Sequence, residues 1–238
     1  MLAASQAIGM NISLSMKNEK IQKKLTEILT QRSRKFSEIE KNYILPFEPS
    51  NFPYFLKKNF NQYNGFILEI GSGWGEFTLE LAKQNRDSLI IALEKKKKRI
   101  IRSIKNQKKE NIENIRWMLL DVSWYFEDIF AENSFDHIII NFPDPWPKKK
   151  HHKHRILTEN FLNSITNISK NGTLFEFASD YWPYIYDALF VIENSKYWQN
   201  INGKGVLLNN IKDRPESYFQ KLKTEEGENT YFLQAEKL

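Results

Sequence analysis

A glycine-rich loop next to a carboxylate is the first feature of this sequence that could do chemistry. Glu69 is followed by Gly71, Gly73 and Gly75 in the stretch EIGSGWG. Glycines let a backbone turn tightly and approach a ligand closely. The spacing is GxGxG, because Glu76 stands where a dinucleotide-binding loop has its third glycine. A carboxylate beside the loop repels phosphate and suits a cation, so the pattern favours S-adenosyl-L-methionine over NAD.

Two further carboxylates follow later apolar runs. Glu94 comes 25 residues after Glu69, where an acidic side chain accepts hydrogen bonds from ribose hydroxyls, and Asp121 falls where the adenine would lie. Each carboxylate alone has an ordinary alternative as a solvated loop residue or a helix N-cap. A second alternative takes Lys95–Lys98 as a clamp for the 2′-phosphate of NADP, but Glu94 would then lie against that phosphate. The joint occurrence of the three carboxylates, Glu69, Glu94 and Asp121, favours a cofactor site.

A proline-rich loop and a basic run come next, from Asn141 to Arg155. Three prolines in five residues restrict the backbone and hold Asp144 and Trp146 in place. The eight residues 148–155 are all Lys, His or Arg, and they include three of the four His of the chain. The run therefore indicates an RNA contact, with a solvated loop as the alternative. Trp146 has two interpretations, stacking on a base or packing under the loop.

The segment PDPWPK, Pro143–Lys148, with the basic run after it, resembles the signature of the bacterial tRNA (guanine-N7-)-methyltransferases of the TrmB type. The resemblance covers roughly residues 30–238. It implies a methyl transfer from S-adenosyl-L-methionine to the variable-loop guanine 46 of tRNA, with Asp144 as the catalytic residue. The implied cofactor-binding residues are Glu69, Gly71, Gly73, Gly75, Glu94, Asp121 and Asp144. The implied substrate and RNA contacts are Lys148, Asp180, Ser217, Tyr218, Phe219, Gln220, Lys150, His151, Lys153 and Arg155, with Arg32, Arg34 and Lys35 matching a basic N-terminal segment.

The sequence departs from this family at two places. Ser217–Gln220, SYFQ, stands where the family has Thr-x-Phe/Tyr-Glu, so a hydroxyl is kept while a charge is lost. His154 replaces a usual Arg, which would make that contact depend on pH. The first departure puts the guanine contacts of this segment in doubt.

Methylation of guanine N7 sets simple chemical requirements. N7 carries a free lone pair, so no proton leaves the nucleophile, and the product ring is cationic. The enzyme must align N7, methyl carbon and sulfur, and place a negative group where positive charge develops. Asp144 suits both tasks, because its carboxylate accepts from guanine N1–H and N2–H₂. We interpret it as an orienting and electrostatic residue rather than an obligatory base.

Alternating apolar runs and amphipathic stretches must position these residues. We expect strands at Phe66–Ile70, Leu89–Glu94, Ile115–Leu120, His137–Asn141 and Thr173–Ala178, and helices around 75–85, 96–108, 123–130, 156–168 and 181–193. Val206–Leu208 and Thr230–Ala235 indicate an antiparallel edge. The pattern predicts an α/β fold, a doubly wound, mostly parallel sheet, and the resemblance implies the Rossmann-like class I S-adenosylmethionine-dependent methyltransferase fold. Ligands bind at the carboxyl ends of such strands.

Length and composition set the remaining limits. The chain has 238 residues, which we divide into a basic, helical arm at 1–45 and a catalytic domain at 46–238. Its net charge of +6 rests on 27 Lys and 8 Arg, a bias that an A+T-rich genome also produces. No Cys is present, and no apolar run approaches the ~20 residues that span a bilayer. We expect a cytoplasmic monomer or homodimer with tRNA as partner, and neither a metal nor a membrane.

Three other functions remain open from the residues alone. Asn141-Phe142-Pro143 is similar to the Asn-Pro-Pro-aromatic loop of methyltransferases that modify exocyclic amines, but the second proline is absent. A non-enzymatic RNA-binding module with a vestigial cofactor pocket finds its best support in Gln220. An NADP oxidoreductase requires a hydride-transfer site, which we do not find.

Overall fold

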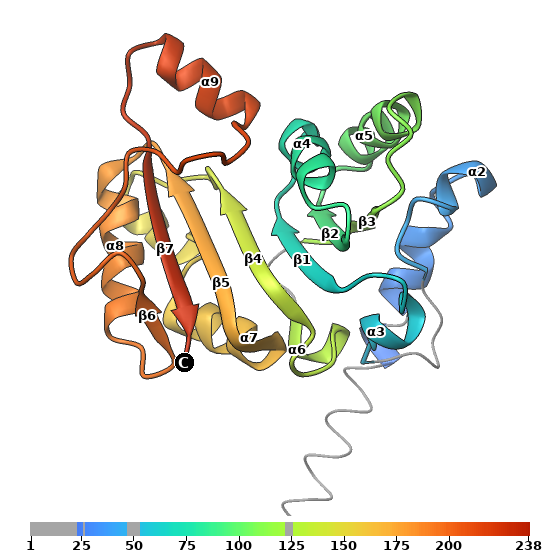
Figure 1. Ribbon diagram of the computed structural model, residues 1–238, viewed down its shortest axis with the longest axis horizontal. Helices are drawn as coiled ribbons and strands as arrows, with labels where there is room; N and C mark the ends of the chain where they lie inside the picture. The colour runs from blue at the N-terminus through green and yellow to red at the C-terminus, as the bar shows by residue number, and fades with distance from the viewer. Residues whose placement is uncertain (1–22, 26, 47–52, 122–125) are drawn as a thin grey trace, which may run out of the picture.

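A seven-stranded sheet organises the chain in the computed structural model, which describes residues 23–25, 27–46, 53–121 and 126–238. The strand order is β3-β2-β1-β4-β5-β7-β6 (Figure 1). Strands β1 to β5 pair in parallel, while β7 is antiparallel to both β5 and β6. The strands are Gly65–Ile70 (β1), Ser88–Glu94 (β2), Ile115–Leu119 (β3), Phe135–Asn141 (β4), Ser169–Ser179 (β5), Trp198–Asn200 (β6) and Tyr231–Lys237 (β7). The predicted mostly parallel sheet with an antiparallel C-terminal edge is confirmed.

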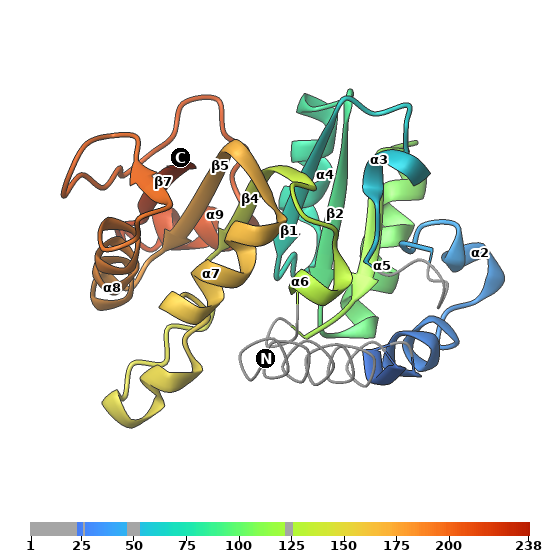
Figure 2. The same cartoon turned by 90° about the horizontal axis from the view of Figure 1, so that it is seen from below.

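Helices cover the two faces of this sheet, as Figure 2 shows from below. Their bounds are Glu38–Lys41 (α2), Leu56–Asn59 (α3), Glu76–Gln84 (α4), Lys97–Lys109 (α5), Phe126–Ile129 (α6), Glu159–Ile168 (α7), Trp182–Glu193 (α8) and Tyr218–Glu225 (α9). A 3₁₀ helix, η2, spans Lys149–His154. Within the described residues, no helix has the length and apolar character that a membrane span requires.

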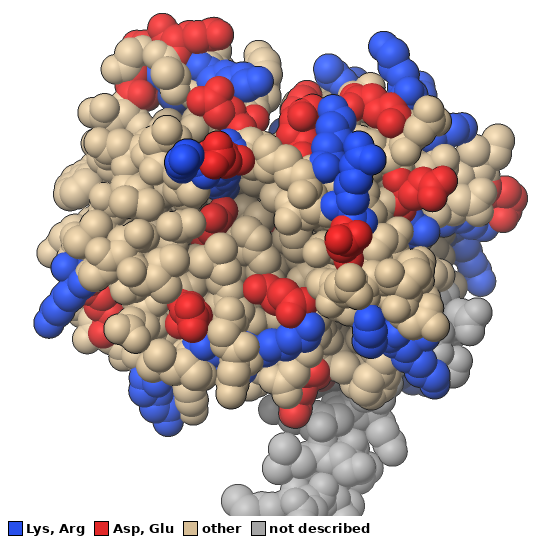
Figure 3. Space-filling model, viewed as in Figure 1, with Lys and Arg blue, Asp and Glu red and all other residues tan. Residues whose placement is uncertain are grey.

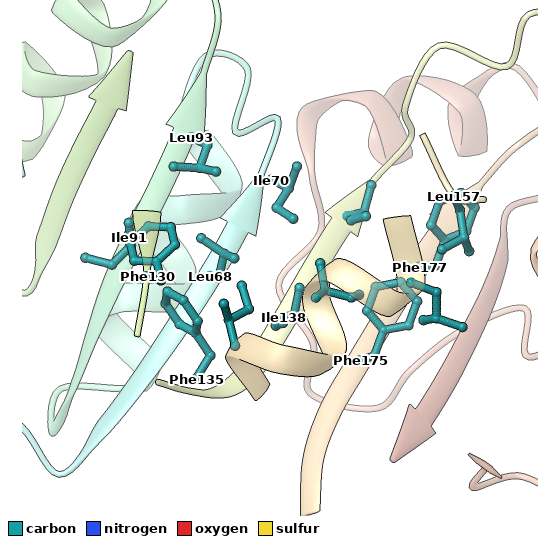
Figure 4. Packing of buried hydrophobic residues seen from close by; sticks show 14 of the residues in the cluster. Leu68, Ile70, Ile91, Leu93, Phe130, Phe135, Ile138, Leu157, Phe175 and Phe177 are labelled. Carbon is teal, nitrogen blue, oxygen red and sulfur yellow. The ribbon is translucent and has the colours of Figure 1, made fainter. Parts of the chain in front are cut away.

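Two apolar clusters, one on each face, hold the layers together. Leu68, Ile70 and Ile138 belong to the cluster that includes residues of α7 and α8 (Figure 4). Ile67 and Ile139 belong to the other cluster, with residues of α4 and α5. Successive strand side chains point to opposite faces, so strands covered on both sides must be apolar at nearly every position. This explains why β1 and β2 are almost continuously apolar.

The described part of the N-terminal arm packs onto the outer edge of this sheet. Leu29, Phe36 and Ile44 are buried, and Ile44 forms a parallel bridge with Trp117 of β3. Arg32 Nη1 donates to the carbonyl of Leu119 at 3.0 Å. Residues 1–22 of the predicted arm lie outside the described residues. The end of the arm is thus joined to the main core.

The edge of the sheet differs from the prediction at one strand. Val206–Leu208 is not a strand, and only an isolated bridge pairs Leu208 with Phe232. Trp198–Asn200 forms the edge strand β6 instead. The indole of Trp198 is buried and donates to Thr166 Oγ1 at 2.7 Å, so tertiary burial selects this three-residue segment. Part of the predicted 123–130 helix, residues 123–125, lies outside the described residues.

Candidate active site

A cavity of about 780 Å³ opens at the carboxyl ends of β1, β2 and β4. It brings together four of the predicted cofactor residues, Gly71, Glu94, Asp121 and Asp144. A second cavity, of about 990 Å³, lies between α7, α8 and the chain end, and none of the predicted site residues lines it. The cavity at the carboxyl edge is therefore the candidate active site. The described residues contain no group of three His, Asp or Glu side chains arranged to hold a metal ion.

The glycine loop makes the floor of this cavity accessible. Gly71, Gly73 and Gly75 have φ of 81°, 60° and 82°, a left-handed backbone that favours glycine. A Cβ built on Gly71 or Gly73 meets nothing within 4 Å, whereas one on Gly75 would lie 2.5 Å from Ser103 Oγ. Gly71, which lines the cavity, thus leaves open space for a ligand, whereas Gly73 and Gly75 are not among the lining residues. Gly75 instead allows close packing of the loop on α5 and β3.

We expect Gly75→Ala to destabilise the protein by about 2–4 kcal/mol, because overpacking adds to left-handed backbone strain. Ser103 has little room to move, since its Oγ donates to the carbonyls of Trp74 and Arg99 at 2.9 and 3.0 Å. Gly172→Ala is the matched control, because Gly172 has a φ of 79° and open space around its Cβ. Urea denaturation measures both variants. Equal losses of unfolding free energy would show that the contact with α5 is unimportant.

The two glutamates of the cofactor prediction lie in different environments. Glu94, at the end of β2, accepts from the N–H of Gly73 and Lys96 at 3.1 and 2.8 Å and from Arg99 Nη1 at 3.3 Å. It lines the cavity and holds the glycine loop against β2. Glu69 is 1% exposed and does not line the cavity. Glu69 is therefore a buried residue outside the cavity lining, and its cofactor contact stays a prediction.

Burial dominates the electrostatics of Glu69. It raises the pKa of the carboxyl group to about 7, against the opposing effects of the Thr78 hydroxyl, which donates at 2.5 Å, and of the positive charge of Arg214. Glu69 is thus a buried group that joins β1 to α4.

The loop after β4 combines rigidity with strain. Phe142 and Trp146 have φ of 44° and 45°, values that are unusual for bulky side chains and cost of order 1–3 kcal/mol each. Between them, the Asp144 side chain is 74% exposed at the cavity, with Oδ2 3.9 Å from Lys95 Nζ. Trp146 lines the cavity and lies against the rings of His151 and His154 at 5.7 and 5.1 Å. Strained backbone that surrounding contacts maintain is typical of functional loops.

Arg155 secures the end of this loop and also lines the cavity. Its side chain is 4% exposed, pairs with Asp187 of α8, and donates to the Pro145 carbonyl at 2.9 Å. Its guanidinium lies 4.8 Å from the Tyr184 ring. Tyr184, whose pKa burial raises to about 12, accepts from the N–H of Ile156 at 2.9 Å. Because these partners largely bury Arg155, it holds the loop on α8, and its RNA contact stays a prediction.

The remaining cations of the basic run are placed differently. Lys148, Lys150 and Lys153 are exposed, and Lys153 lines the cavity. His151 is partly buried beside Trp146. The 3₁₀ helix η2 therefore presents its lysines to solvent next to the cavity.

The predicted C-terminal substrate segment begins helix α9. Ser217 is the N-cap, and its Oγ accepts from the N–H of Gln220 at 3.0 Å. Gln220 is buried and its Oε1 finds no hydrogen-bond partner among the described residues, while Tyr218 is exposed. The Phe219 ring lies 5.3 Å from that of Phe142, so α9 contacts the loop after β4. None of these four residues lines the cavity.

Asp180 and Lys148, the other two predicted substrate residues, are also outside the cavity lining. Asp180 Oδ2 lies 3.9 Å from Lys223 Nζ of α9. This ion pair links the end of β5 to the same helix that carries Ser217.

A buried polar network on the α4 side of β4, β5 and β7 was missed by sequence reasoning. Arg214 Nε donates to Glu176 Oε2 at 2.9 Å, and its Nη2 donates to Asn141 Oδ1. Gln234 donates to Glu176 Oε1 at 2.9 Å, and His137 Nε2 lies 3.7 Å from Oε2. Figure 1 shows these strands with α7 and α8 behind them. The only signal in the sequence is an Arg before Pro215, which is too weak to find the network.

The strand order of the sheet defines the class of fold, and solved structures of methyltransferases share it. The chain is similar to a structure titled "Structure of an antibiotic related Methyltransferase", with a TM-score of 0.59, 16% identity, and coverage of 83% of this chain and 98% of that one. It is also similar to TrmN from Thermus thermophilus, with a TM-score of 0.52, 16% identity, and coverage of 77% and 47%. The protein has the Rossmann-like class I methyltransferase fold.

Sequence relatives then identify the family. The family described as "Putative methyltransferase" matches residues 64–233. A tRNA (guanine-N(7)-)-methyltransferase of Leptospira interrogans is 36% identical over 71% of this chain and 76% of its own length. One from Buchnera aphidicola is 33% identical over 74% of this chain and 73% of its own. The chain belongs to the tRNA (guanine-N(7)-)-methyltransferase family, as the PDPWPK resemblance predicts, and it is an enzyme.

Proposed function

We propose that this enzyme transfers the methyl group of S-adenosyl-L-methionine to N7 of the variable-loop guanine 46 of tRNA. The observation that carries the proposal is the position of Asp144, which lies on a strained, proline-rich loop at the rim of the cavity that the glycine loop and Glu94 also line. Membership of the family supports guanine N7 as the acceptor.

The cavity fits the cofactor. The open space at Gly71 and Gly73 is a cradle that a Cβ would fill. Glu94 and Asp121 supply carboxylates for ribose and adenine, and together with Asp144 they give the cavity three acidic groups. These carboxylates favour a cationic group placed beside them, while Lys95, Arg99, Lys153 and Arg155 line other parts of the same cavity. The bound cofactor would supply an electrophilic methyl group on its sulfonium.

The residues of the chain perform alignment and charge stabilisation. Asp144 accepts from N1–H and N2–H₂ of the guanine, which selects guanine over adenine and places negative charge beside the ring as it becomes cationic. Lys148, Lys150 and Lys153 contact RNA phosphates near the cavity. Since N7 carries no proton, no general base is required.

The test is to incubate the full chain with unmodified tRNA and methyl-labelled S-adenosyl-L-methionine, digest the RNA, and identify the labelled nucleoside by chromatography and mass. We expect labelled 7-methylguanosine, and none when guanine 46 is replaced by adenine. Labelled N2-methylguanosine or N6-methyladenosine would assign the enzyme to the exocyclic-amine class. Cofactor binding without any label on tRNA would support the vestigial pocket instead.

A further inference from the structure

The basic residues on and before α5 fall into groups with different environments. Lys97 Nζ lies 5.6 Å from the Phe36 ring, and Arg99 pairs with Glu94 at 3.3 Å. Lys108 and Lys109 occupy the last turn, where cations stabilise the helix dipole. These positions have structural explanations. The exposed cations of the first half of the helix do not.

Arg102 is the best defined of these unexplained cations. Its guanidinium lies 4.8 Å from the ring of Trp74, and that of Arg99 lies 5.5 Å from the same ring. The hydroxyl of Ser103 donates to the Trp74 carbonyl at 2.9 Å, which ties the indole-bearing loop to α5. Arg102 is exposed, and across the described part of the chain no carboxylate oxygen lies within 4.0 Å of it. A guanidinium stacked on an indole keeps its N–H groups available in one plane.

This pair lies next to the candidate active site. Trp74 stands between Gly73 and Gly75 in the cofactor loop. Lys95 and Arg99, from the end of β2 and the start of α5, line the cavity. Lys153 lines it from the loop after β4. Because β1 lies between β2 and β4, cationic side chains flank the cavity on two sides.

The positive charge in the first turn of α5 also destabilises that helix. The first turn of α5 carries Lys97, Lys98 and Arg99 and no acidic residue, although the positive end of a helix dipole disfavours cations there by about 0.3–1 kcal/mol each. Figure 3 shows Lys and Arg side chains, with Asp and Glu side chains beside them, over the part of the molecule that α4 and α5 occupy. An arrangement that costs the isolated protein stability is favourable once a polyanion binds.

We infer that Arg102, stacked on Trp74 and assisted by Lys98, contacts a backbone phosphate of the RNA strand that enters the cavity, on the β2 side opposite the lysines of η2. The inference rests on the proposed function, because it takes tRNA as the substrate. The planar N–H groups of the guanidinium match the geometry of a phosphate, and the indole limits the rotamer freedom that binding would otherwise remove. The surface therefore positions the nucleotides that flank the target base.

The test compares Arg102→Gln, Arg102→Lys and, as matched control, Lys108→Gln, an exposed cation ~9 Å further along the same helix. The tRNA Kd is measured between about 50 and about 200 mM salt, with kcat and KM of methyl transfer. We expect Arg102→Gln to raise Kd and KM about tenfold and to lower the logarithmic salt slope by about 0.7–0.9, with kcat unchanged. Arg102→Lys keeps the slope and loses part of the affinity. Lys108→Gln changes neither.

Equal behaviour of Arg102→Gln and Lys108→Gln would overturn the inference. If the wild-type enzyme forms 7-methylguanosine in tRNA while Arg102→Gln keeps its salt slope, only the phosphate contact is wrong. If the wild-type enzyme neither methylates nor binds tRNA, the proposed function is wrong as well. The cofactor Kd, which we expect to be unchanged in Arg102→Gln, separates loss of RNA contact from damage to the glycine loop.

Discussion

Asp144→Asn is expected to lower kcat for methyl transfer to guanine by about 100- to 1,000-fold, the cost typical of removing one group that stabilises transition-state charge. The amide keeps the shape of the side chain and removes its charge. It also offers a donor where the guanine N1–H and N2–H₂ need an acceptor. Both changes act on the purine as it becomes cationic, so kcat falls rather than only KM rising.

Folding is expected to be unaffected by this substitution. The Asp144 side chain is 74% exposed, and its contact with Lys95 is a 3.9 Å ion pair between exposed groups, which contributes little to stability. The control is Glu113→Gln. Glu113 is exposed and lies just before β3, at the amino ends of the strands and away from the cavity. Single-turnover rates with saturating tRNA and thermal melting measure both variants. A near-normal rate for Asp144→Asn would refute the electrostatic role.

Arg214→Met is expected to destabilise the protein by about 3–5 kcal/mol, because it removes the cation nearest to the buried carboxylate of Glu176. The two side chains are only 6% and 7% exposed, with Nε and Oε2 2.9 Å apart. Met keeps much of the apolar contact with the rings of Phe77 and Phe232, which lie 4.6 and 5.1 Å from the guanidinium. The loss of unfolding free energy therefore reports mainly on the removed charge of Arg214.

Two comparisons test this reason by urea denaturation. Lys170→Met breaks a 2.7 Å pair with Asp136 whose side chains are 37% and 43% exposed, and it should cost less than about 1 kcal/mol. The double variant Arg214→Met/Glu176→Gln should recover part of the lost unfolding free energy, since it also removes the buried negative charge of Glu176. No recovery would show that packing, not charge, explains the loss.

The expected pH dependence of the stability of the protein follows from Glu176. Burial alone would raise the pKa of its carboxyl group, yet the hydrogen bond and charge of His137 and the charge of Arg214 lower it from 4.5 to about 2. A lowered carboxyl pKa contributes stability above the unfolded value, and that stability is lost as the pH falls from about 4.5 to about 2. The difference in stability between wild type and Arg214→Met should therefore narrow over this range.

Local patterns were sufficient for much of the fold and part of the candidate site. The apolar runs of β1 and β2 are long because both faces are covered, so they are visible in the sequence. The glycines and the prolines are equally visible, since each restricts the backbone at its own position. The cofactor and substrate roles of Gly71, Glu94, Asp121 and Asp144 stay predictions, although one cavity brings all four together.

Long-range contacts account for what sequence reasoning missed. Trp198–Asn200 became the edge strand because the Trp198 indole finds a buried place against Phe175 and Thr166. Arg155 belongs to a basic run, yet Asp187 and Tyr184, about 30 residues away, bury it.

The sequence by itself determined the class of fold and the family, and it predicted the carboxyl edge as the place of chemistry, because backbone periodicity and loop residues act locally. Only the tertiary structure decided which charged residues are available. Arg155 and Arg214 are enclosed by distant partners, whereas Arg102 is stacked on Trp74 and left exposed. A charge is equally visible in a sequence wherever it lies, but its free energy depends on neighbours that only folding brings within a few ångströms.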